Sequence, residues 1–163
     1  MNANDRNVMF SHKNDEYQTP QKLFDLLDAE FHFNVDAAAN SENTKCPVFM
    51  DNALDAPIWT TTKETFFLNP PYSKIGLFIK KSYEESLKGA TVVCLIPVRS
   101  DTDYWHTFVM RAEEIRFILH RLKFDLPKEL QGEDYKLNSA PFPSCIVVFR
   151  NHYGSTKISS YKF

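Results

Sequence analysis

Apolar residues recur at helical spacing in three separate stretches of this chain. Each stretch follows a residue that favours a helix start: Thr19-Pro20, Ser73 or Asp101. Thr, Ser and Asp are preferred N-caps, and Pro suits the first helical position. Helices are therefore predicted to begin at these points, and Gly89 is expected to end the second. The apolar positions are Leu23, Phe24, Leu26, Leu27 and Phe31, then Ile75, Phe78, Ile79, Tyr83 and Leu87, then Tyr104, Trp105, Phe108 and Val109.

Short runs rich in β-branched and aromatic residues separate these stretches and predict strands at 33–36, 47–50, 66–68, 91–96, 115–119 and 145–149. The run at 91–96 is continuously apolar, which is typical of a strand covered on both faces in a parallel sheet. Strands and helices alternate until a loop joins the last two strands. This order predicts a three-layer α/β domain with a mostly parallel sheet, and it leaves open an antiparallel pair at the edge.

Two segments fall outside this alternation. Residues 1–15 are polar and rich in Asn and Asp, so a mobile N-terminal arm is expected there. Residues 121–144 are polar and contain prolines, which indicates an excursion from the sheet. No internal repeat or change of composition marks a boundary, so residues 16–163 are expected to form a single domain.

Composition narrows the class of protein. Of 163 residues, 43% are hydrophobic and 25% charged, as in a soluble globular domain. No apolar stretch approaches the ~20 residues that span a membrane. The three cysteines lack paired spacing, which favours buried thiols in a cytoplasmic protein. The five histidines lack metal-ligand spacing, so no metal site is expected. A net charge of −2 argues against strong non-specific binding to nucleic acid but allows a local basic face.

The candidate chemistry lies in the tetrapeptide Asn69-Pro70-Pro71-Tyr72, directly after the strand predicted at 66–68. A residue before proline is pushed away from the helical region, and neither proline has an N–H to pair. The Asn69 side-chain oxygen and the Pro70 carbonyl can then converge as two acceptors beside the Tyr72 ring. This arrangement predicts a receptor for a flat molecule with an exocyclic amine. A plain Pro-Pro turn is the alternative, although adjacent prolines are uncommon.

Such a receptor suits the transfer of a methyl group to nitrogen. An amine conjugated to an aromatic ring is planar, and its delocalised lone pair makes it a poor nucleophile. Two acceptors that hold its N–H groups favour a tetrahedral nitrogen with the lone pair aimed at an electrophile. No metal or general base is required when the methyl donor is a sulfonium.

With its surroundings, the tetrapeptide resembles the Asn-Pro-Pro-Tyr class of amino-methyltransferases, and most closely the small phage-type DNA N6-adenine methyltransferases. The resemblance covers residues 16–149. It is carried by Tyr17-Gln18-Thr19-Pro20, Phe33-Asn34-Val35-Asp36-Ala37-Ala38, Asn43-Thr44-Lys45-Cys46, Trp59, Phe67-Leu68-Asn69-Pro70-Pro71-Tyr72-Ser73, Leu95-Ile96-Pro97 and Pro141-Phe142-Pro143-Ser144.

The resemblance implies an S-adenosylmethionine-dependent enzyme with a Rossmann-like, seven-stranded sheet that methylates adenine N6 in DNA. It implies cofactor contacts from Thr19, Pro20, Asp36 and Ala37, with Asp36 facing the methionine part. A role for Asp36 as a turn or cap carboxylate is the alternative. Asp51 is the candidate for the ribose hydroxyls.

Two points of the implied cofactor site stay open. Asp55 lies close to Asp51 in the sequence and competes with it for the ribose. The glycine-rich turn that many methyltransferases have after the first strand is replaced here by Asp36-Ala37-Ala38-Ala39. Because alanine disfavours positive φ, this departure puts the geometry of the loop and the affinity for the cofactor in question.

DNA as a partner requires that the target adenine leave the duplex stack. Lys74, just past the tetrapeptide, and Arg99 and Ser100, just past the strand at 91–96, are candidates for contact with phosphates or base edges. Arg121 and Lys123 begin the excursion 121–144, which is the candidate target-recognition segment. A solvated surface is the alternative role for each of these residues.

Other readings of the same residues remain. The acceptor amine can instead be cytosine N4, adenine in RNA or a protein glutamine. Cytosine N4 enzymes more often carry Ser in place of Asn69, and a glutamine methylase usually has a separate substrate-binding domain. A catalytically silent nucleic-acid-binding protein of the same fold is a further alternative, which the intact Asn69–Tyr72 turn disfavours.

Overall fold

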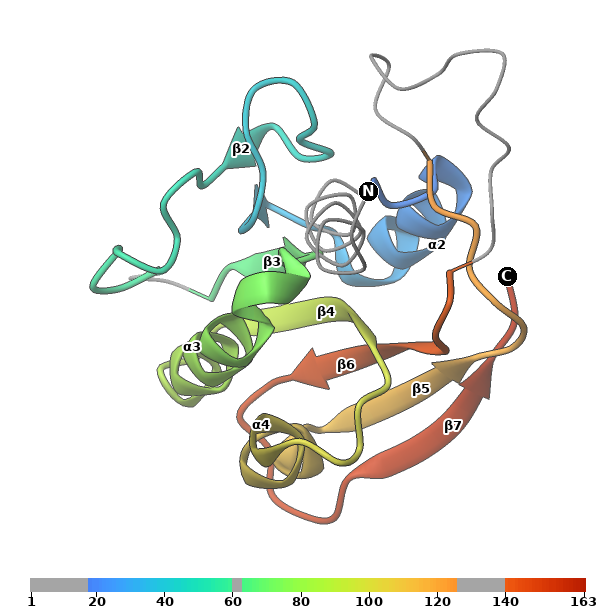
Figure 1. The fold of residues 1–163 in the computed structure, drawn as a ribbon. Helices are drawn as coiled ribbons and strands as arrows, with labels where there is room; N and C mark the ends of the chain where they lie inside the picture. Colours follow the sequence, from blue (N-terminus) through green and yellow to red (C-terminus); the bar gives the residue numbers. More distant parts are fainter. Residues whose placement is uncertain (1–17, 60–62, 126–139) are drawn as a thin grey trace, which may run out of the picture.

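The computed structural model describes residues 18–59, 63–125 and 140–163 (Figure 1). The arm predicted at 1–15 and most of the excursion predicted at 121–144 lie outside these ranges. No helix within them is long and apolar enough to cross a membrane.

The described strands form one seven-stranded sheet in the order β2-β1-β3-β4-β6-β5-β7. The strands are β1 Val35–Asp36, β2 Val48–Phe49, β3 Thr65–Leu68, β4 Thr91–Pro97, β5 Glu114–Ile118, β6 Ser144–Phe149 and β7 Lys157–Tyr161. This outcome confirms the α/β class and the seven strands implied by the resemblance.

The sheet is mixed rather than mostly parallel, which corrects the prediction. β2, β1, β3 and β4 pair in parallel, as do β5 and β7, but β6 is antiparallel to both of its neighbours. The reversed strand lies inside the sheet instead of at its edge. Because β5 and β6 pair antiparallel, β6 starts at the edge of the sheet where β5 ends.

Helices cover both faces of the sheet, as predicted for three layers (Figure 1). α2 (Gln21–Phe31) packs on one face, where Leu23 and Leu27 meet Phe67 of β3. α3 (Ile75–Leu87) and α4 (Asp103–Thr107) pack on the other, where Ile79 and Phe66 belong to the second core cluster. Successive residues of each central strand point to opposite faces, so a continuously apolar sequence fills both layers.

The predicted helix caps are wrong. The N-cap positions are Pro20 for α2, Lys74 for α3 and Thr102 for α4, and none of these caps makes a side-chain hydrogen bond. Thr19 is 3% exposed and faces a cavity instead of the first turn of α2. Ser73 lies inside a 3-10 turn, η1 (Tyr72–Lys74), which directly precedes the start of α3. A second one, η2 (Val109–Arg111), follows α4.

The C-terminal end of α3 is as predicted. Gly89 has φ +110°, a conformation that residues with a Cβ rarely adopt. The Gly89 N–H donates to the Ser86 carbonyl and the Ala90 N–H to the Glu85 carbonyl, which together make a Schellman motif.

One strand was missed from the sequence. β7 pairs in parallel with β5 at the edge of the sheet, and four of its five residues are exposed. An exposed edge strand needs no apolar alternation, so the sequence carried no signal for it.

Candidate functional site

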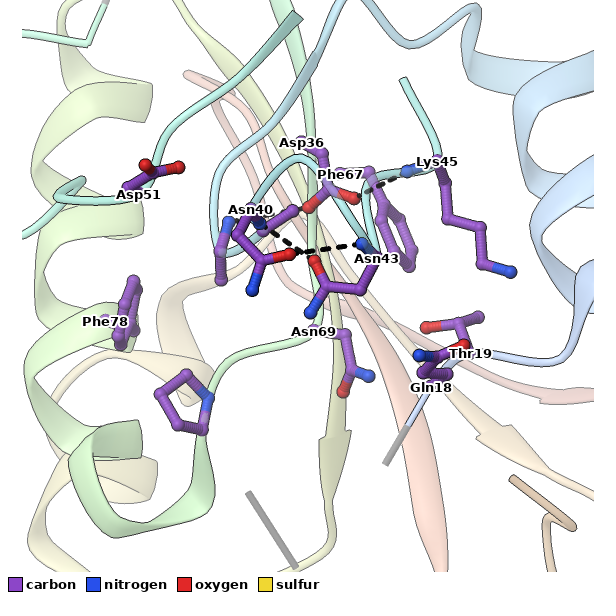
Figure 2. Close-up of a pocket in the computed structure, with 13 residues that line it drawn as sticks. Gln18, Thr19, Asp36, Asn40, Asn43, Lys45, Asp51, Phe67, Asn69 and Phe78 are labelled. Atoms are coloured by element: carbon purple, nitrogen blue, oxygen red, sulfur yellow. Dashed lines mark hydrogen bonds between the residues drawn. The ribbon is translucent and has the colours of Figure 1, made fainter. Parts of the chain in front are cut away.

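A cavity lies where the strand order reverses. From β1 the chain continues to the neighbour on one side, β2, and then to the neighbour on the other side, β3. In α/β sheets such a switch point at the carboxyl ends of the strands is the usual place for a ligand. The cavity here has a volume of about 340 Å³ (Figure 2). Its walls come from the start of α2, the loops after β1, β2 and β3, and one turn of α3: Gln18, Thr19, Asp36, Ala38, Ala39, Asn40, Asn43, Lys45, Asp51, Phe67, Asn69, Pro71 and Phe78.

Asp36, the last residue of β1, is 4% exposed and lies on the cavity wall. Its Oδ1 accepts the Ala38 N–H at 3.4 Å, and its Oδ2 accepts the Lys45 N–H at 3.1 Å. Burial raises the pKa of Asp36, while these two hydrogen bonds oppose the rise. Asp36 therefore both closes the loop 37–45 and brings a carboxylate to the cavity. The two alternatives for Asp36, a turn carboxylate and a residue of the candidate site, do not exclude each other.

Asparagine side chains hold the loop 37–45 in place by accepting hydrogen bonds from its backbone. The Asn40 N–H donates to Asn43 Oδ1 at 2.8 Å, and Asn40 Oδ1 accepts the N–H groups of Glu42 and Asn43. Within the described ranges only His32 and His120 combine a side chain with positive φ, so the alanines after Asp36 need no glycine-like conformation. This resolves the question that the missing glycines raised about the geometry of the loop.

The predicted cofactor residues are only partly brought together. Thr19, Asp36 and Asp51 line the cavity, whereas Pro20 and Ala37 do not. Ala37 is buried, and its N–H pairs with the Phe67 carbonyl in the sheet. The two following alanines take its place on the wall.

Asp51, and not Asp55, reaches the cavity. The Met50 N–H donates to the Asp36 carbonyl at 2.9 Å, which extends the pairing of β1 and β2 as far as the residue before Asp51. Phe78 of α3 lines the cavity together with Asp51 (Figure 2). Its sequence position showed only that it lies on the apolar face of a helix.

The loop after Asp51 is fastened to α3. Trp59 donates its ring N–H to the Ala53 carbonyl at 2.7 Å and its backbone N–H to Glu85 Oε2 at 3.2 Å. The Glu85 side chain is 0% exposed and lies 3.0 Å from Lys81 Nζ and 2.8 Å from Lys88 Nζ. Burial is the largest single influence and would raise the pKa of Glu85, but the hydrogen bonds from Lys88, Lys81 and Trp59 together lower it.

The tetrapeptide forms the rim of the cavity after β3. Asn69 and Pro71 line the cavity, whereas Pro70 and Tyr72 border the same turn without contributing to the wall. Pro71 has φ −58° and ψ 129°, and the Lys74 N–H closes the following turn onto its carbonyl at 3.1 Å.

A second aromatic ring meets Tyr72. The centroids of Tyr72 and Phe142 are 5.3 Å apart, with the planes at 73°. Phe142 arrives there because the Val98 N–H, just after β4, donates to the Pro143 carbonyl at 2.9 Å and holds this segment at the end of the strand. Phe142 was not among the predicted site residues; its flanking prolines were the available signal.

The predicted nucleic-acid residues are exposed and lie outside the cavity wall. Lys74 ends the turn after β3, and Arg99 and Ser100 follow β4. Arg121 and Lys123 follow β5, so all five lie past the carboxyl ends of parallel strands, on the side of the cavity.

The segment at 121–125 has one buried and one exposed side. Leu122 and Phe124 are buried in the α2 face of the core, while Arg121 and Lys123 are exposed. Gln18 and Asp125 exchange two backbone hydrogen bonds, of 3.2 and 3.0 Å, which join this segment to the residues before α2. Two basic side chains are thus displayed beside the cavity.

The described residues contain no group of three or more His, Cys, Asp or Glu that could hold a metal ion. Together, the cavity at the switch point, the carboxylates on its wall and the Asn-Pro-Pro-Tyr turn at its rim define an α/β protein with a candidate ligand site at the carboxyl edge of its sheet.

Comparison with known proteins gives the family. Residues 7–162 match the family described as DNA N-6-adenine-methyltransferase (Dam), and the chain belongs to this family. A curated relative, the DNA N-6-adenine-methyltransferase of Escherichia phage T1, is 28% identical over 123 residues. That match covers 74% of this chain and 50% of the relative, so the chain matches about half the length of the phage protein. The predicted resemblance is confirmed.

Proposed function

We propose that this protein transfers a methyl group from S-adenosylmethionine to the N6 amine of adenine in DNA. The observation that carries the proposal is the position of Asn69. It lies on the wall of the cavity that contains Asp36 and Asp51, and it also begins the turn that leads to Tyr72. A methyl donor in the cavity and an amine held by the tetrapeptide would therefore meet at one residue. Membership of the Dam family supports the same chemistry.

The residues of the cavity fit S-adenosylmethionine. We also propose that the sheet is of the Rossmann-like class. A volume of about 340 Å³ lies within the range of small-molecule sites. Asp36 supplies a buried carboxylate for an ammonium, Asp51 a carboxylate for hydroxyl groups and Phe78 an apolar surface. When bound, the cofactor supplies an electrophilic methyl group on a sulfonium; Thr19, Asp36 and Asp51 hold it in place.

The tetrapeptide positions the acceptor. Asn69 Oδ1 and the Pro70 carbonyl each accept one N–H of the amine, which leaves the nitrogen lone pair free to point into the cavity. Tyr72 and Phe142 offer two rings, 5.3 Å apart at their centroids, against which an extruded base packs. Orientation and fixed acceptors supply the rate enhancement, so no general base is needed in the attack.

The test incubates the purified protein with methyl-labelled S-adenosylmethionine and unmodified duplex DNA, followed by digestion to nucleosides. The expected product is N6-methyladenine. Labelled N4-methylcytosine, or label only in RNA or protein when these are offered, would assign the protein to another planar amine. No label in any natural DNA at saturating cofactor would contradict the proposal.

A further inference from the structure

One basic residue lines the cavity. Among the described residues of the wall, Lys45 is the only basic one. Its Nζ lies 2.9 Å from Gln21 Oε1, a neutral amide oxygen, and within the described ranges no carboxylate lies within ion-pair distance of it. The ammonium is therefore held in place without an ion pair, although the Asp36 carboxylate lies near enough to interact with it electrostatically. A half-buried lysine in that state is suited to an anionic group.

The backbone fixes where this charge stands. The Lys45 N–H donates to Asp36 Oδ2 at 3.1 Å, so the side chain leaves the loop at the point where Asp36 closes it. The carboxylate of Asp36 and the base of the Lys45 side chain are neighbours for this reason. An acid and a base side by side on one wall match a zwitterion, whose ammonium and carboxylate are also neighbours.

The two ends of the cavity differ. Figure 2 shows Lys45, Thr19 and Gln18 on one side, Asp51 and Phe78 on the other, and Asp36, Asn40, Asn43 and Asn69 between them. The Lys45 side has both charges of an amino acid within reach, whereas the Asp51 side offers a carboxylate and an aromatic ring.

We propose that Lys45 binds the carboxylate of the methionine part of the cofactor and thereby sets which way round the cofactor lies. The inference rests on the proposed function and adds one residue to it. The methionine end lies toward Lys45 and Thr19, the sugar lies toward Asp51, and Gln21 holds the ammonium without neutralising it.

The test compares two ligands that differ only in the carboxylate: S-adenosylhomocysteine and its decarboxylated analogue, which keeps the amine. Binding of each to the full chain is measured by calorimetry. In the Lys45→Met variant, affinity for S-adenosylhomocysteine should fall about 10–100-fold, as expected for a charge-assisted hydrogen bond. Affinity for the decarboxylated analogue should change by less than about twofold, and Lys45→Arg should restore most of the loss. If Lys45→Met does not fold, Lys45→Gln carries the same comparison.

Gln21→Ala is the matched control, because it removes the contact between the loop and α2 but leaves the charge. It should bind S-adenosylhomocysteine far better than Lys45→Met. An equal loss of affinity for both ligands in Lys45→Met, or an equal loss in Gln21→Ala, would show that Lys45 only fastens the loop and would overturn the inference. Failure of the wild-type chain to bind either ligand would instead overturn the proposed function beneath it.

Discussion

At the scale of the residue, Asp36 and Asn69 both line the cavity, and the proposed function gives each of them a different reactant. They stand on adjacent strands: Asp36 pairs with Phe67, and Asn69 follows Phe67 by two positions. Asp36 is almost fully buried, whereas Asn69 is half-buried at the rim. If the proposed function is correct, substitutions at the two sites should affect different steps, because Asp36 is assigned to the methyl donor and Asn69 to the acceptor amine.

Asn69→Ala should abolish most turnover and leave cofactor binding nearly unchanged. The substitution removes an acceptor for the amine, and loss of one such preorganised group typically lowers kcat by about 10²–10³-fold. Methylation rate and the Kd for S-adenosylhomocysteine should be measured on the same preparation. Asn151→Ala, at an exposed position after β6, is the control and should behave as wild type. A wild-type rate in Asn69→Ala would refute the proposal that Asn69 accepts a hydrogen bond from the amine.

Cofactor binding should weaken as the pH falls, and this loss should begin at a higher pH than it would for an aspartate with an ordinary pKa. Burial raises the pKa of Asp36, so the carboxylate that we propose for the ammonium of the cofactor is lost as pH falls through that raised value. The Kd for S-adenosylhomocysteine measured against pH should rise in this window, and Asp36→Asn should flatten the rise. An identical profile in Asp36→Asn would assign the titration to another group.

The raised pKa of Asp36 affects the stability of the fold in the opposite direction to its effect on cofactor binding. Because the folded state raises the pKa of Asp36, this group favours folding below its ordinary pKa, and that contribution is lost as pH rises through the folded value. The ligand-free chain therefore carries the cost of an ionised buried carboxylate at neutral pH. In the proposed function, the ammonium of the cofactor would offset this cost.

Single residues were predictable where a strand end determines their place. Asp36, Asp51 and Asn69 each follow a recognisable apolar run, so the sequence alone put them at one edge of the sheet. Phe78, Phe142 and Lys45 could not be found in this way. They reach the site through packing of a helix and folding of loops, and none of them directly follows the end of an apolar strand.

At the scale of the element, the helix starts near the site follow the cavity rather than the capping rules. Thr19 is a preferred cap residue, yet it faces the cavity, and Ser73 lies inside the turn that carries Tyr72. Gly89, far from the cavity, ends α3 as local rules predict. The capping rules therefore failed at the helix starts beside the candidate site and held at the end of α3, which lies away from it.

Glu85→Ala should destabilise the protein by about 3 kcal/mol, since it leaves Lys81 and the Trp59 N–H without their buried acceptor. Because the pKa of Glu85 is lowered, its contribution is present above the ordinary glutamate pKa and is lost as pH falls through the lowered value. Free energies of unfolding in urea at neutral and acid pH check both statements; the difference between variant and wild type should shrink in acid.

The neighbouring Glu84 provides the control for Glu85. Its carboxylate lies 3.9 Å from Lys80 Nζ, and both side chains are about half exposed. Glu84→Ala should cost no more than about 0.5 kcal/mol. Equal costs for Glu84→Ala and Glu85→Ala would mean that the fastening of the loop after Asp51 to α3 contributes nothing to stability.

At the scale of the whole molecule, the strand order puts every proposed function on one edge of the sheet. Six strands run in the same direction, so their carboxyl ends lie together, and the reversed strand β6 begins at that edge. For this reason Phe142 lies against Tyr72, and Asp125 pairs with Gln18 beside the cavity. The sequence predicted the layers and the position of the site, but not the reversed central strand, since direction depends on the connection and not on the strand itself.

The basic residues on this edge should bind DNA independently of the cofactor. Arg121 and Lys123 are exposed beside the buried Leu122 and Phe124, so alanines at both positions remove charge without opening the core. The double variant should weaken binding of duplex DNA and reduce the slope of log K against log salt by about 2, while the Kd for S-adenosylhomocysteine stays unchanged. Fluorescence anisotropy over a salt series measures the slope.

A double alanine variant at Lys63 and Lys157, which are exposed at the amino ends of β3 and β7 on the opposite edge, is the control. Equal losses in the two double variants would show that DNA responds to net charge alone, and the assignment of this edge to DNA would then be wrong.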